Sequence, residues 1–350
     1  MLRFVLSRLL YGGIVLLLVT ILVSTIIYLS PVDPATLTFG QRLDEETVRL
    51  KREQLGLDLP LHEQVALYIR DVSPLFIGSQ ASWNESYEGG YIAIGSIALG
   101  MKWPYLRESY QSGDTVSTMI ISAFANTLIL TAIALLLAIT LGISLGLLAG
   151  YMQGTWVDRV IILISTLGFS VPSYVTAIVL GVVFGYYLRD YTGLNIQGSL
   201  FELNDLGDDV VVWKNLLLPA IALGIRPVAI ITQLMRSSFL DTVGKKYVLA
   251  ALAKGLSKRR VLKDHILRNA MNPVVTALSG WLAALLAGAF FVEFIFNYKG
   301  LGYVTVQALI NYDIPVVLGA LLFTSALFVM INIAVDIIYS VIDPRIELSR

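Results

Sequence analysis

Polar side chains that interrupt long apolar stretches are the residues of this chain with the widest scope for chemistry. Six of them stand inside such stretches: Asn126, Arg226, Gln233, Glu293, Asn332 and Asp336. A charge at mid-bilayer costs about 2.5–3.5 kcal/mol on insertion scales, so such groups usually face a pathway or a polar partner. We take Asn126, Gln233 and Glu293 as candidates for a translocation path. Hydrogen bonding between helices explains them at least as well, and Arg226 and Glu293 could pair with each other.

A second group of polar residues forms a basic segment between two apolar stretches. Residues 239–268 hold eight of the chain's 25 lysines and arginines: Lys245, Lys246, Lys254, Lys258, Arg259, Arg260, Lys263 and Arg268. A short loop this basic stays in the cytoplasm, because its translocation is disfavoured. Basic cytoplasmic loops are common in inner-membrane proteins, so the charge by itself indicates topology as readily as a docking surface.

Several motifs of catalysis and metal binding are absent. The chain has no Gly-x4-Gly-Lys-Ser/Thr loop, because Gly244-Lys245-Lys246 lacks the upstream glycine and the following hydroxyl. It has no His-Glu-x-x-His, no cysteine, and only two widely separated histidines, His62 and His265. We therefore expect no ATPase, no cofactor and no metal site in this chain.

The composition places the chain among integral membrane proteins. Hydrophobic residues make up 56% and charged residues 14%, and the mean hydropathy is +0.75. A soluble domain has about 25% charged residues. The balance of 25 acidic and 25 basic residues gives no support for nucleic-acid binding.

Six apolar stretches reach the roughly 20 residues that cross a bilayer. They are residues 9–29, 120–149, 157–188, 216–235, 274–296 and 316–341. Pro172 divides the third, whose halves are too short to cross separately, so we expect one long helix that is kinked or partly unwound there. The result is an all-α integral membrane protein with six transmembrane helices and both termini in the cytoplasm.

Three regions follow from this topology. Residues 1–30 form an N-terminal transmembrane helix, 31–115 an extracytoplasmic segment, and 116–350 a core with the basic loop at 239–272. The outer segment holds seven basic and twelve acidic residues. We predict amphipathic helices at 44–55 and from Leu61 onward, and assign no structure to 78–113.

Small residues shape the basic loop. Ala250, Ala251 and Gly255 lie close together on a helix, and a face without bulky side chains lets a partner approach closely. Gly255 is placed to end one short helix and Ser257 to begin the next. Pro273 is expected in the first turn of the helix that re-enters the membrane.

The stretch Tyr247-Val-Leu-Ala-Ala-Leu-Ala-Lys-Gly-Leu-Ser257 resembles the "EAA" loop of ABC importer permeases. It is most similar to the dipeptide/oligopeptide/nickel branch, in which Tyr-Val-x-x-Ala-x-Ala-Lys-Gly-x-Ser is typical. Leu249 stands where the motif has glutamate, a departure common in this branch. The resemblance implies a loop that inserts into a separate ATPase, through Tyr247, Leu249, Ala250, Ala251, Lys254, Gly255, Leu256 and Ser257.

Further landmarks extend the resemblance along most of the chain. They include Pro31-Val-Asp-Pro34, Asn126-Thr-Leu128, Trp156-Val-Asp-Arg159, Ser170-Val-Pro-Ser173, Arg236-Ser-Ser238, Gly300-Leu-Gly302 and Asp343-Pro-Arg345. The region of about 75–113 is longer than this family usually has.

The resemblance implies the type I ABC importer permease fold, extended by the segment between helices 1 and 2. It implies a pore-forming subunit that imports di- or oligopeptides across the plasma (inner) membrane of a bacterium or archaeon. The expected partners are a second permease, usually forming a heterodimer, two cytoplasmic ATPases that bind ATP and Mg²⁺, and an extracytoplasmic substrate-binding protein.

Two alternatives stay open. An importer of the same family for nickel or another small solute would share these motifs. A secondary transporter would usually show inverted repeats and acidic residues at the membrane midplane, and we see neither.

Overall fold

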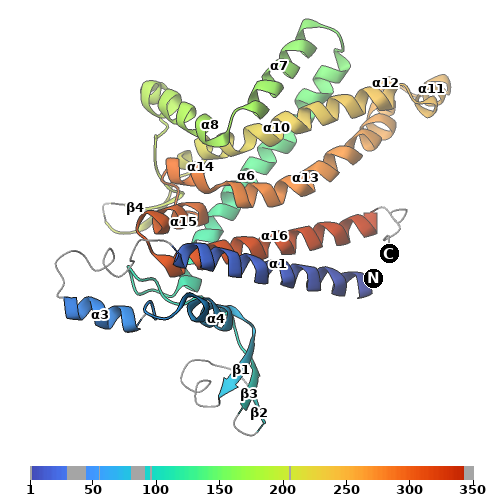
Figure 1. Cartoon of the computed structure of the whole chain (residues 1–350). Coiled ribbons are helices and arrows are strands. Elements are labelled where there is room, and N and C mark those ends of the chain that lie inside the picture. The colour runs from blue at the N-terminus through green and yellow to red at the C-terminus, as the bar shows by residue number, and fades with distance from the viewer. Residues whose placement is uncertain are drawn as a thin grey trace. The chain divides into compact units, whose positions relative to one another are not determined.

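The computed structural model describes residues 2–29, 45–54, 56–79, 91–94, 97–204 and 206–342. The chain divides into two compact units, one of Met1–Ala123 with Val304–Arg350 and one of Phe124–Tyr303. Figure 1 shows the elements coloured along the chain. The landmarks predicted at 31–34 and 343–345 lie outside the described residues.

In the first unit, helices α1 (Leu2–Tyr28) and α16 (Ile314–Ile342) lie side by side (Figure 1). Gly12 allows this approach, because a Cβ there would meet Val329 Cγ1 at 2.6 Å. Arg8 Nη2 pairs with Asp336 Oδ2 at 3.0 Å, which gives this carboxylate a partner in its own unit. The other faces of α1 expose leucine, isoleucine and valine, as expected of a helix that meets lipid.

The outer segment contains the two predicted helices, α3 (Glu45–Gln54) and α4 (Leu61–Val72). An antiparallel sheet in the order β1-β3-β2 extends into the stretch 78–113, for which no structure was predicted. Its strands are β1 (Leu75–Ser79), β2 (Tyr91–Ile94) and β3 (Ile97–Met101). The described chain is mostly helical, as predicted, and this small outer sheet is an addition that the sequence analysis did not assign.

A polar cluster ties the outer segment to the turn before α16. Arg107 Nη2 pairs with Asp71 Oδ2 at 2.9 Å, and Lys102 Nζ donates to the Asp71 carbonyl at 2.6 Å. The Tyr110 amide donates to Asp313 Oδ1 at 3.0 Å. Asp71 and Asp313 are both buried, so these hydrogen bonds are needed to offset the loss of water.

Helix α6 (Val116–Tyr151) begins in the first unit and continues into the second, where α7 (Trp156–Ser170), α8 (Ser173–Leu180) and the π-helix η1 (Gly181–Tyr187) follow. The chain breaks at Pro172 as predicted, but α7 and the α8–η1 segment form a pair bent by 106°, so residues 157–188 are not one continuous helix. Pro172 cannot donate a backbone hydrogen bond, and Val171 before it is extended, with φ −82° and ψ 129°. The chain therefore starts a new helix in a new direction.

The rest of the second unit follows in order. It comprises α9 (Arg189–Thr192), β4 (Phe201–Leu203), β5 (Asp209–Val211), α10 (Lys214–Val243), α11 (Lys246–Ala253), α12 (Lys258–Val261), the π-helix η2 (Leu262–Leu267), α13 (Arg268–Gly288) and α14 (Phe290–Ile295). Helix α15 (Leu301–Ile310) runs from this unit into the first.

Four helices in the described part of the chain are long and apolar enough to cross a membrane: α1, α6, α10 and α16. The α7–α8 pair gives a fifth crossing if it counts as one. The remaining predicted span, 274–296, is divided between α13 and α14.

Close packing of α6 on α10 organises the second unit. Gly142, Gly146 and Gly150 recur every four residues on α6, a spacing that favours tight helix contacts. A Cβ on them would meet Ile231, Met235 and Phe239 of α10 at 2.6–2.7 Å. The same stretch contains the sequence Gly142-Ile-Ser-Leu-Gly146. This is the spacing of a hydrolase nucleophile motif, but that motif requires a strand-to-helix turn and here it runs inside a helix.

Candidate functional site

The basic loop folds as predicted around a glycine. Gly255 has φ +81°, which side chains rarely adopt, and it follows the last turn of α11. Its amide donates to the Leu252 carbonyl at 2.9 Å, and the Leu256 amide donates to the Ala251 carbonyl at 3.3 Å. These two bonds are the Schellman arrangement, so the predicted helix end at Gly255 is confirmed. Ser257 stands at the N-cap of α12, without a capping bond from its side chain.

Helix α11 has two unlike faces. Val248 and Ala251 are buried, with relative exposures of 1% and 6%, in a cluster with Phe239, Val261 and Ile266. The exposed residues around the rest of the helix form what we call the α11 outer face: Tyr247, Leu249, Ala250 and Leu252. Leu249 is 58% exposed and Tyr247 43%. The expected small-residue face is thus divided, since Ala251 packs inside and Ala250 faces out.

The rest of the loop is mostly exposed. Lys254, Gly255 and Ser257 are exposed, and Leu256 is half-buried. We expected Pro273 in the first turn of a helix, and this prediction is wrong. Helix α13 begins at Arg268 and continues directly from η2, so Pro273 lies inside it. The basic loop is therefore in continuous helical connection with the fifth predicted span.

Glu293 is enclosed and fully hydrogen-bonded. Its relative exposure is 0%. Oε1 accepts from Thr127 Oγ1 at 2.7 Å, and Oε2 accepts from the Gly302 and Tyr303 amides at 2.7 and 3.2 Å. Those amides begin α15, so the carboxylate lies against the positive end of a helix. The structure brings Glu293 to Thr127, and no ion pair with Arg226 is formed among the described residues.

Asn126 lies one residue before that threonine and is half-buried. Its Nδ2 donates to the Lys299 carbonyl at 2.7 Å, and its own carbonyl accepts from the Tyr298 hydroxyl at 3.1 Å. Both bonds join α6 to the loop between α14 and α15, the loop that also holds Glu293's partners.

Gln233 lies in a different environment. It is exposed on α10, and it shares a face with Arg226 seven residues earlier and Ser237 four residues later. We call Arg226, Gln233 and Ser237 the α10 polar stripe. Of the three residues predicted for a translocation path, Gln233 is the one with an exposed side chain.

An ion pair that our sequence predictions did not include connects α7 to α10. Arg236 Nε lies 2.6 Å from Asp158 Oδ1 and Arg236 Nη2 lies 2.8 Å from Oδ2, the two-pronged geometry of a strong pair. Asp158 Oδ2 also accepts from the Gly154 amide at 2.9 Å. Asp158 and Arg236 each belong to a motif shared with the family, Trp156–Arg159 and Arg236–Ser238. These motifs were the sequence signal from which a role for the two residues could have been predicted.

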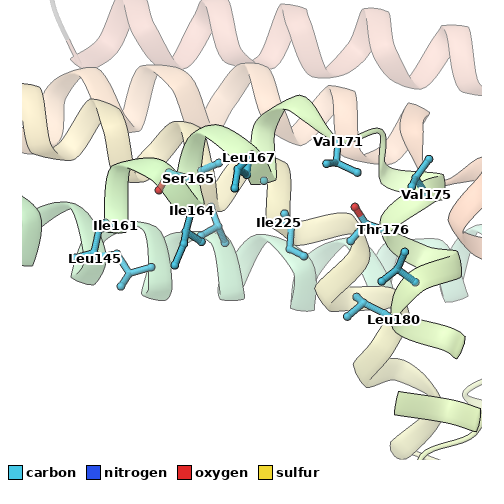
Figure 2. A pocket seen from close by; sticks show the side chains of 14 residues that line it. Leu145, Ile161, Ile164, Ser165, Leu167, Val171, Val175, Thr176, Leu180 and Ile225 are labelled. Carbon is cyan, nitrogen blue, oxygen red and sulfur yellow. The ribbon is translucent and has the colours of Figure 1, made fainter. Parts of the chain in front are cut away.

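An apolar cavity of about 600 Å³ lies where α7 bends into α8 (Figure 2). Leu145 of α6, Ile161 and Leu167 of α7, and Ile225 of α10 are among its lining residues. Ser165 and Thr176 are its polar side chains. No three His, Asp or Glu residues in the described ranges are arranged to hold a metal ion.

Comparison with known proteins connects these features to transport. Residues 142–348 match the family described as binding-protein-dependent transport system inner membrane component, and residues 1–131 match the N-terminal region of such membrane components. A glutathione transport system permease protein, GsiC, of Salmonella choleraesuis is 33% identical over 347 residues, covering 99% of each chain. A Brucella suis biovar 1 protein named as a candidate peptide permease is 32% identical over 353 residues, covering 100% of both.

Solved structures agree on the fold. An inward-facing structure of the MetNI methionine ABC transporter matches with a TM-score of 0.52 at 17% identity, covering 65% of this chain and 97% of that one. A second crystal form of that transporter gives a TM-score of 0.51 with the same coverage. At this identity the likeness shows the fold alone.

Proposed function

Because this chain belongs to the family of binding-protein-dependent transport system inner membrane components, the permeases of ABC importers, we propose that it imports di- or oligopeptides. The relatives named for glutathione and peptide transport support this substrate class, since glutathione is itself a tripeptide. Nickel or another small solute is the second candidate, and the absence of any metal-holding group in the described residues gives it no support.

The observation that carries the proposal is the α11 outer face. Leu249 and Leu252 are exposed apolar side chains three residues apart on one side of a short helix, and Tyr247 is exposed on another side. The basic residues of the loop favour a cytoplasmic position. Exposed apolar side chains gathered on one short helix favour a protein partner. We assign that partner as a cytoplasmic ATPase, which binds the ATP and Mg²⁺ that this chain has no motif to hold.

The buried side of α11 explains how docking would act on the membrane helices. Val248 and Ala251 pack on Phe239 of α10 and on Val261 and Ile266, which lead into α13. A displacement of α11 is therefore passed to two long helices through a packed apolar cluster, because packed interiors transmit strain.

The remaining parts of the proposal follow from the family. The working complex has a second permease, usually a different chain, two ATPases and an extracytoplasmic substrate-binding protein. Six crossings put both termini in the cytoplasm of a bacterium or archaeon, in its inner membrane. The translocation path runs along the α10 polar stripe, which includes Gln233, while Asn126 and Glu293 hold the helices that border it.

The test is ATP-driven uptake of a labelled tripeptide into vesicles that contain the whole importer and its binding protein. Ala250→Trp adds a bulky side chain to the α11 outer face without changing buried contacts, because Ala250 is exposed. We expect uptake and co-purification of the ATPases to fall at least tenfold.

A matched pair of glycine variants separates bulk from backbone strain. Gly255→Trp and Gly154→Trp place the same residue at φ +81° and +79°, each in open space, and only Gly255 lies in the basic loop. We expect loss of ATPase binding at 255 and retention at 154. Normal transport by both Ala250→Trp and Gly255→Trp would show that the loop is only a topology signal. Retained ATPases without peptide uptake by the unmodified importer would contradict the substrate class alone.

A further inference from the structure

Arg226 is a cation near the middle of a membrane-spanning helix. Helix α10 runs from Lys214 to Val243, so Arg226 stands 12 residues from one end and 17 from the other. At 1.5 Å per residue, it is about 18 Å and about 26 Å from these ends. Arginine remains charged in proteins, and a charge at this depth usually marks a functional site.

The part of the chain that the structure describes supplies no anion to this guanidinium. None of the ion pairs formed there includes Arg226, and its Nε is buried without a hydrogen-bond partner. Among the described residues of the second unit, the buried carboxylates are Asp158, which pairs with Arg236, and Glu293, which accepts from Thr127 and from the start of α15.

The guanidinium lies over an aromatic ring. Its Cζ is 5.5 Å from the centre of the Phe169 ring, at the end of α7 just before the Pro172 break. A cation–π contact with a ring uses none of the hydrogen bonds that the guanidinium N–H groups can donate. Arg226 is half-buried and Phe169 is 42% exposed, so the pair lies at an accessible surface.

The neighbours of Arg226 along α10 suit a peptide. Gln233 lies on the same face, about 10.5 Å away by the helix rise, and its amide can both donate and accept hydrogen bonds. An extended chain spans about 3.3–3.6 Å per residue, so three residues bridge that distance. A terminal carboxylate at Arg226 would place the preceding backbone amides beside Gln233.

We propose that Arg226 binds the C-terminal carboxylate of the peptide as it passes through the membrane, with Phe169 orienting the guanidinium. The assignment rests on the proposed peptide import and adds a residue that recognises the substrate. A free C-terminal carboxylate is common to all linear peptides whatever their side chains. The planar guanidinium fork matches it with two parallel hydrogen bonds.

The experiment compares uptake of one labelled tripeptide with uptake of its C-terminal amide, in vesicles that contain the whole importer and its binding protein. The quantity of interest is the ratio of the two initial rates at subsaturating peptide. Comparing this ratio between unmodified importer and variants cancels both the preference of the binding protein and differences in importer yield.

Arg226→Gln is expected to lower the carboxylate-to-amide ratio about tenfold, by slowing uptake of the free acid. Arg226→Lys keeps the charge but loses the fork, so a fall of about threefold is expected. If the Arg226→Gln importer does not assemble, the Arg226→Lys importer is used to test the proposal. Ile230→Ala, one turn further along the same face, is the matched control and should leave the ratio unchanged.

An unchanged ratio in the Arg226 variants overturns the assignment. If the ratio is unchanged and both peptides are slowed equally, Arg226 supports transport in another way, such as pairing with an acidic residue of another subunit. If the unmodified importer takes up neither peptide, the proposed function fails and this assignment fails with it.

Discussion

Glu293 and Arg226 are two ionisable residues of the second unit whose surroundings differ completely. Glu293 is fully buried and accepts hydrogen bonds from Thr127 and from two amides at the start of α15. Arg226 is half-buried, lies over the Phe169 ring, and has an Nε for which the described residues supply no hydrogen-bond partner. An ionisable group satisfied within its own chain stabilises the fold, whereas one left without a counter-charge indicates that the counter-charge comes from another molecule.

The same distinction separates the Asp158–Arg236 ion pair from the α11 outer face. The ion pair is complete within the chain, and Asp158 is only 4% exposed. The α11 outer face, by contrast, leaves Leu249 58% exposed and Tyr247 43% exposed. The complete contact holds α7 against α10, and the incomplete one is available for a partner.

The largest effect on stability is expected from removing the Glu293 carboxylate. Glu293→Ala removes the carboxylate that accepts from the Thr127 hydroxyl and from two buried amides, at about 1–3 kcal/mol for each hydrogen bond. Arg226→Gln should change the unfolding free energy by less than about 1 kcal/mol, because no hydrogen bond is lost. Thermal unfolding in detergent, followed by tryptophan fluorescence, measures both. Equal losses in the two variants would remove the contrast.

Breaking the Asp158–Arg236 pair should follow in size. Asp158→Asn or Arg236→Gln leaves a partner charge in a poorly hydrated site, and the loss is about 3 kcal/mol. The double variant should lose less than the sum of the single variants, with an interaction energy of about 0.5–3 kcal/mol. A strictly additive double-mutant cycle would show that the two side chains act independently.

Two glycines test how far packing decides the effect of one methyl group. A Cβ on Gly302 would collide with the Phe290 backbone, so Gly302→Ala should cost about 1–3 kcal/mol. Gly280 lies in α13 with open space around it, so Gly280→Ala should stabilise the helix by up to about 1 kcal/mol. Matched thermal unfolding of both variants gives the comparison, and a stable Gly302→Ala would contradict the tight contact.

The smallest effect concerns pH and the outer segment. Burial lowers the pKa of Lys102 to about 8 from the ordinary 10.5, with Asp71 partly opposing the shift. Between about pH 8 and 10 the Lys102 side chain is protonated in the unfolded chain and has released its proton in the folded chain. Stability should therefore rise with pH in this window.

Unfolding temperatures at pH 7.5 to 9.5 should show this rise in the unmodified protein. Lys102→Met cannot titrate and serves as the control, with a flatter profile expected. Parallel profiles for the two proteins would mean that Lys102 does not titrate in the folded state within this window.

Much of the architecture was predictable because it depends on local patterns. Long apolar runs indicated the positions of α1, α6, α10 and α16, and the four-residue spacing of Gly142, Gly146 and Gly150 is a local pattern that favours a close helix contact. The helix end at Gly255 was predictable because only glycine readily adopts a positive φ there. The outer sheet was not predicted in part because β1 pairs with β3 across an intervening segment, Leu75 with Met101 and Ser79 with Ile97.

For the candidate site, the sequence determined which residues are polar within the membrane and which loop is basic. It could not distinguish Glu293, Asn126 and Gln233, since all three are polar residues in apolar stretches. Only the tertiary structure decided that Glu293 meets Thr127, that Asn126 meets Lys299 and that Gln233 is exposed beside Arg226. The physical reason is that a polar group's role depends on the donors and acceptors around it, and helices distant in the chain supply them.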